Sequence, residues 1–229
     1  MAVKKTASVK KHEPDLKAKS SLYLWPFVAV NVAVFLSVVI NKGLPLSLQS
    51  LEQFWSQVRA KNGIIAVSIP IAVIVLGGVL SDVAKARLVF WRWQNPLPGC
   101  RAFSHLLAAD PRIDGKVLAA KHGRFPRKPS EQNALWYKLY REHKMKPMVW
   151  YSHRTYLLTR DLATIAACFV LLFSAGAGLA QVGWKTLACY SGVLILQYVI
   201  IASAARNYGC RFVQNVLCEE CNCCRTSPT

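Results

Sequence analysis

The sequence predicts an all-α membrane protein, with four transmembrane helices and a small helical cytoplasmic domain between the second and the third. Three observations support this fold class. The 229-residue chain is 53% hydrophobic and only 17% charged, whereas soluble domains carry about 25% charged residues. Four stretches are apolar over the roughly 20 residues that a helix needs to cross a bilayer. The formal net charge is +18, and the basic residues are unevenly distributed between these stretches.

The predicted spans are 21–41, 63–81, 162–180 and 186–205. We expect each to be a helix, because every backbone N–H and C=O inside lipid needs a hydrogen-bond partner within the chain. None of the four contains Lys, Arg, Asp or Glu. Since ionisable residues inside spans mark proton and substrate pathways, their absence from these sequences disfavours a pump.

The basic residues predict the orientation of the spans. Of the 29 Lys and Arg, all but four lie in the N-terminal arm (1–20), the central segment (82–161) and the C-terminal tail (206–229). Only the loops 42–62 and 181–185 remain for the opposite side. By the positive-inside rule, both termini and the central segment are cytoplasmic.

The first external loop, 42–62, contains an amphipathic pattern. Leu48, Leu51, Trp55 and Val58 fall near one face of a helix, and polar residues occupy the other face. A helix of this kind is expected to lie flat at the outer interface. It could be a collar over a central pathway or a structural plug that packs on the bundle.

The central segment, 82–161, shows helical signals and no strand pattern. We expect the second span to continue as helix to Trp93. A helix capped by Asp114 should end at Gly123, where a left-handed residue is required. A further amphipathic helix is expected over 130–144, and from Met148 the chain should be helical into the third span.

The same segment should bind anions, because sixteen Lys and Arg against six Asp and Glu give it a net charge of +10. Its partner could be the anionic leaflet, a nucleotide, a cyclic oligonucleotide, a lipid headgroup or a cytoplasmic protein. Direct nucleic-acid binding is disfavoured, since no zinc finger or RNP motif is present. The candidate anion ligands are Arg101, Arg112, Arg124, Arg127 and Lys128. The candidate hinge that couples this domain to the spans is His153, Arg154 and Arg160.

No catalytic residue or cofactor is assigned. The sequence contains no GxxxxGK[ST], GxGxxG, GxSxG or HExxH motif. Asp110 and Asp114 come closest to the paired acids that an interfacial enzyme acting on lipid phosphates would need, but Pro111 interrupts their helical spacing.

The eight cysteines are concentrated at the C-terminal end, where Cys218, Cys221, Cys223 and Cys224 follow one another closely. Their thiolates could bind zinc or copper, or they could be lipidated, or the tail could be dispensable. A disulfide framework is not expected for cysteines on the cytoplasmic side.

Three phrases in the stretch 91–161 carry a resemblance to a known group of proteins: NPLPGCRAFSHLLAADPRID, EQNALWYKLY and SHRTYLLTRDLA. They resemble uncharacterised bacterial four-span membrane proteins, some of which are suspected to act in anti-phage defence. The resemblance implies a multi-pass protein of the bacterial inner membrane that responds to a cytoplasmic partner or signal.

The leading hypothesis is therefore a non-enzymatic homo-oligomer in contact with membrane lipids. Its basic domain senses an anionic ligand or partner protein and moves the spans, which could perturb the membrane or form a pore. The alternatives are a scaffold or assembly partner without conductance, and the lipid-phosphate enzyme.

Overall fold

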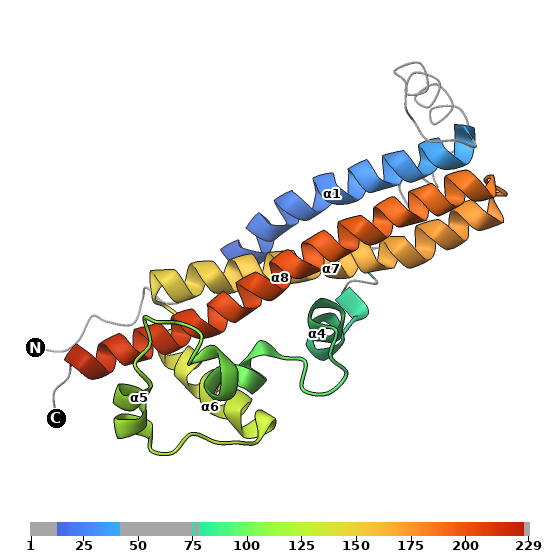
Figure 1. The fold of residues 1–229 in the computed structure, drawn as a ribbon. Coiled ribbons are helices and arrows are strands. Elements are labelled where there is room, and N and C mark those ends of the chain that lie inside the picture. The colour runs from blue at the N-terminus through green and yellow to red at the C-terminus, as the bar shows by residue number, and fades with distance from the viewer. Residues whose placement is uncertain (1–12, 42–74, 76–77, 227–229) are drawn as a thin grey trace, which may run out of the picture. The chain divides into compact units, whose positions relative to one another are not determined.

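The computed structural model describes residues 13–41, 75 and 78–226. All regular secondary structure in these ranges is helical, which confirms the all-α fold class for the part of the chain described (Figure 1). The amphipathic helix expected within 42–62 lies outside these residues, and so does most of the second predicted span, 63–81.

Among the residues that the structure describes, three helices are long and apolar enough to cross a membrane. They are contained in α1 (Glu13–Asn41), α7 (Pro147–Leu179) and α8 (Trp184–Thr226). The first, third and fourth predicted spans each lie on one of these helices. Helix α8 has 43 residues and is about 65 Å long, twice the thickness of the hydrocarbon core. Its apolar part, 186–205, is therefore long enough by itself to cross a membrane.

The chain divides into two compact units. We call Met1–Val79 with Ile165–Leu196 the span unit, and Leu80–Thr164 with Gln197–Thr229 the basic unit. The C-terminal tail thus belongs to the same unit as the central segment, and α7 and α8 each continue from one unit into the other.

Aromatic stacking holds the span unit together. The rings of Phe35 on α1 and Phe173 on α7 stack with centroids 4.4 Å apart. Gly176 allows this close approach, because a Cβ at that position would lie 2.9 Å from the Phe35 ring. Helices α7 and α8 are joined by a hydrogen bond of 2.9 Å from the Ser191 hydroxyl to Ser174.

The basic unit begins with a separate short helix, α4 (Asp82–Phe90). The Ser81 hydroxyl caps it by accepting from Ala84 N, and Trp91 ends it with a left-handed φ of 52°. The prediction of a helix that continues to Trp93 was therefore wrong. Helix α4 begins after the capping residue Ser81 and ends before Trp91, which adopts the αL conformation.

Four further elements follow α4 before α7 begins. They are η1 (Pro98–Arg101), the π-helical turn η2 (Ala102–Leu106), α5 (Gly115–His122) and α6 (Pro129–His143). The predicted N-cap is confirmed, since the Asp114 carboxylate accepts from Lys116 N and Val117 N. Helix α5 ends before Gly123 as expected, but Gly123 adopts φ 73° and ψ −155°, which lies outside the αL region predicted for it. The core of the unit packs α4, α5 and α6 against α7 and the polar half of α8.

Candidate functional site

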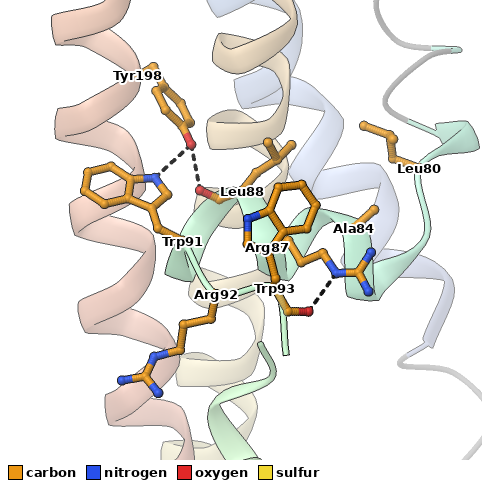
Figure 2. Close-up of a pocket in the computed structure, with 8 residues that line it drawn as sticks. All are labelled: Leu80, Ala84, Arg87, Leu88, Trp91, Arg92, Trp93 and Tyr198. Carbon is orange, nitrogen blue, oxygen red and sulfur yellow. Dashed lines mark hydrogen bonds between the residues drawn. The ribbon is translucent and has the colours of Figure 1, made fainter. Parts of the chain in front are cut away.

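A pocket of about 440 Å³ lies in the basic unit between α4, the segment that follows it and the start of this unit's part of α8 (Figure 2). Its lining combines aliphatic, aromatic and arginine side chains: Leu80, Ala84, Arg87, Leu88, Trp91, Arg92, Trp93 and Tyr198. Such a mixture is typical of a site for a ligand with apolar and anionic parts.

Hydrogen bonds hold the rings of Trp91 and Tyr198 and the backbone at Trp93. The indole Nε1 of Trp91 donates to the Tyr198 hydroxyl at 2.9 Å, and that hydroxyl donates to the Leu88 carbonyl at 2.7 Å (Figure 2). Arg87 Nε donates to the Trp93 carbonyl at 3.2 Å. The left-handed backbone at Trp91 turns the chain sharply enough for these contacts to form.

A neighbouring pocket of about 390 Å³ contains a second group of arginine side chains. It is lined by Arg92, Trp93, Asn95, Arg101 and three neighbours. The Nε and Nη2 atoms of Arg101 are buried and have no acceptor among the residues that the structure describes. Burial lowers the pKa of Arg101, and the nearby charge of Arg92 lowers it further. Two guanidinium groups thus share a site that lacks a compensating anion from the described protein atoms.

Arg206 on α8 has a similar environment. Its guanidinium lies 3.6 Å from the centroid of the Trp91 ring, and its Nε donates to the Val89 carbonyl. Its Nη2 is also buried without an acceptor in the described ranges. We call Arg87, Arg92, Arg101, Arg206, Trp91 and Trp93 together the arginine–tryptophan site.

The five predicted anion ligands do not converge. Arg101 belongs to the arginine–tryptophan site. Arg112 forms a 2.6 Å ion pair with Asp110 and donates to Asn215 at 3.0 Å. The hydrogen bond from Arg112 lowers the pKa of Asp110.

The other three candidates lie at or next to the loop between α5 and α6. Arg124 and Arg127 are exposed there. Lys128, the N-cap residue of α6, pairs with Glu131 at 3.5 Å. Sequence reasoning missed Arg87, Arg92 and Arg206, although the alternation of tryptophan and arginine in 91–93 was a usable signal.

The predicted hinge residues have different environments. Arg160 on α7 pairs with Asp82 at the start of α4 at 2.9 Å and with its neighbour Asp161 at 3.2 Å. Asp161 also forms an ion pair with Lys85, whose Nζ lies 3.0 Å from Asp161 Oδ1. This network links α4 to α7.

His153 is packed instead between aromatic rings, with its ring stacked 4.7 Å from that of Phe212. Arg154 lies over the Trp150 ring.

A second polar cluster, which the sequence did not indicate, surrounds Glu220 on α8. The side chain is 1% exposed. Its carboxylate accepts from the Cys224 thiol at 3.8 Å and from three nitrogen donors on α5 and α6. These are Lys121 Nζ at 2.7 Å, His122 Nε2 at 2.8 Å and His143 Nε2 at 2.5 Å. The cluster ties α5 and α6 to α8.

The metal candidates from the sequence lie on the same helix. Cys218 and Cys221 are buried, and Cys221 Sγ accepts from Asp114 N. Donor atoms of Glu142, His143 and Glu220 lie within 4.8 Å of one another, a spacing that could hold a metal ion. The ammonium group of Lys121 on the same carboxylate competes with a cation there, so the hydrogen bonds already account for the cluster.

The charge of Glu220 should make stability depend on acid pH. Burial by itself raises the pKa of Glu220, but the hydrogen bonds from the three donors outweigh it and hold the pKa at about 2. Since the folded pKa is lowered, the stabilisation is complete above the ordinary glutamate range and is lost as pH falls toward 2. The difference in thermal midpoint between the natural protein and Glu220→Gln should shrink between pH 5 and pH 3, measured in detergent by scanning fluorimetry.

Glu219→Gln is the control, because Glu219 is the neighbouring carboxylate and lies outside the cluster. Its midpoint should follow that of the natural protein at each pH. If the difference in thermal midpoint between the natural protein and Glu220→Gln stays constant down to pH 3, the pKa of Glu220 is not lowered.

No protein-family model, curated protein or solved structure matches this chain.

Proposed function

We propose that this protein is a multi-pass membrane protein that senses an anionic, phosphate-bearing ligand at the arginine–tryptophan site and transmits its binding to the apolar helices. In this proposal both termini and the central segment are cytoplasmic, 63–81 forms a fourth span, and the protein acts as a homo-oligomer. The observation that carries it is that two buried nitrogen atoms of Arg101, Nε and Nη2, have no acceptor among the residues that the structure describes.

An anion is the ligand that best satisfies these groups. A buried donor without an acceptor costs about 1–3 kcal/mol, and more when it is charged. Phosphate oxygens accept several charge-assisted hydrogen bonds from guanidinium groups. Arg92 adds a second positive charge at the same pocket, so an anion there would compensate both residues.

The position of the site supports coupling to the spans. Tyr198 lies within the apolar part of α8, and Arg206 follows directly after that part. Both contact Trp91 within the basic unit. A ligand that shifts the segment 91–93 therefore acts on α8 next to its apolar part, and the expected outcome is a change in membrane permeability, as for an effector in anti-phage defence.

Binding can be tested on the full chain in mild detergent with inorganic pyrophosphate as the probe. We expect pyrophosphate to raise the thermal midpoint, and the double variant Arg92→Gln, Arg101→Gln to bind it at least tenfold more weakly by calorimetry, since each charged hydrogen bond contributes about 1.5–3 kcal/mol. Arg141→Gln is the matched control, because Arg141 is exposed and lies on α6 outside the site. Equal affinity in all three proteins would overturn the proposed site.

The coupling can be tested by ion leak from vesicles that contain the protein. Pyrophosphate should change the leak in the natural protein and in Arg141→Gln, and should have no effect in the double variant. If pyrophosphate binds but the leak stays at the level of empty vesicles, the scaffold alternative replaces the membrane-perturbing role.

A further inference from the structure

We infer that the ligand of the arginine–tryptophan site is a single anionic phospholipid, with its phosphate at Arg92 and Arg101 and an acyl chain in the pocket beside α4. This inference rests on the proposed function and specifies its ligand. It is carried by the combination of buried Arg101 nitrogens, which have no acceptor in the described part of the chain, with an apolar cavity that adjoins them.

The apolar cavity fits a hydrocarbon chain. Ala84 and Leu88 line it from α4, and Leu80 lines it from just before that helix. The rings of Trp91 and Trp93 form another part of its wall (Figure 2). Burying apolar surface there would be favourable for any ligand that carries methylene groups. A free phosphate would leave this part of the site unused.

The apolar and basic parts of the site are continuous. The two pockets share Arg92 and Trp93. A third pocket of about 540 Å³ contains Arg87 and Trp93 from the first, and Asn95 and Cys100 from the second. One molecule can therefore pass around Trp93 and occupy the apolar cavity and the arginine pocket together.

The exposure of the tryptophans indicates access from the membrane. Trp93 is 82% exposed and Trp91 is 52% exposed. Tryptophan and tyrosine rings favour the headgroup level of a bilayer, and Tyr198 at this pocket lies within the apolar part of α8. A phospholipid at that level presents its phosphate to arginine and its chains to apolar side chains.

The test is native mass spectrometry of the full chain, purified in mild detergent with equal amounts of phosphatidylglycerol and phosphatidylcholine. We expect at least tenfold preferential retention of phosphatidylglycerol, lost in the double variant Arg92→Gln, Arg101→Gln. The variant Ala84→Trp places an indole in the apolar cavity and should reduce phosphatidylglycerol retention at least fivefold while pyrophosphate binding persists. Ala120→Trp, at an exposed position on α5, should retain both activities.

A second measurement does not depend on whether Ala84→Trp folds. On the natural protein, dihexanoyl phosphatidylglycerol should displace pyrophosphate at least tenfold more effectively than glycerol 1-phosphate, since only the former carries chains. Equal displacement, or retention of both lipids alike, would overturn the lipid assignment but leave the anion site in place, with a soluble ligand. If the double variant Arg92→Gln, Arg101→Gln binds pyrophosphate as tightly as the control Arg141→Gln, the proposed function itself is overturned.

Discussion

Replacing Glu220 by alanine is expected to lower the free energy of unfolding of the basic unit by about 3–5 kcal/mol, the range measured when one partner of a buried ion pair is removed. The substitution leaves three donors on α5 and α6 without their common acceptor. Because these contacts hold α5 and α6 against α8, the loss affects the docking of both helices.

Thermal unfolding in detergent measures this effect. A change of about 1 kcal/mol moves the midpoint by about 2–4 °C in a protein of this size, so Glu220→Ala should lower it by about 6–20 °C. Glu219→Ala is the matched control, since the same substitution one residue earlier leaves the cluster intact. Similar midpoints for the two variants would show that the cluster contributes little.

Local signals in the sequence predicted much of the fold. Asp114 caps α5 and Gly123 follows it because both signals act within a few residues of the helix end. Three of the four predicted spans lie on apolar helices for the same reason: hydropathy is a property of a continuous stretch. The start of α4 was missed, since Ser81 can be read as a cap only if the apolar run is taken to stop there.

The two polar sites depend on contacts that no local pattern encodes. Glu220 accepts a hydrogen bond from Lys121, which lies 99 residues earlier in the chain. Arg206 and Trp91 meet only because α8 packs beside the end of α4. The sequence identified Arg101 by its charge, but neither its burial nor the approach of Arg92 follows from charge alone. A tryptophan in αL conformation is likewise rare enough that no propensity would predict it.

The second large effect is expected for Trp136→Ala on α6. The indole is 7% exposed, forms an edge contact with the Phe212 ring at 5.2 Å and donates to the Val213 carbonyl at 3.4 Å. Removing a buried tryptophan costs about 3–5 kcal/mol. Trp93→Ala is the control for the same change of side chain, and at an 82% exposed position it should alter the free energy of unfolding by less than about 0.5 kcal/mol.

Trp136→Ala should also weaken the anion site, although Trp136 does not line it. The turn η1 rests on this ring so closely that a Cβ on Gly99 would lie 2.7 Å from Trp136 Cε3. Arg101 is the last residue of that turn, so a cavity under Gly99 lets the guanidinium move away from Arg92. Pyrophosphate affinity, measured by calorimetry below the unfolding temperature of the variant, should fall several-fold. Unchanged affinity in a protein with the lowered thermal midpoint would mean that the position of Arg101 is fixed by its contact with Phe90 instead.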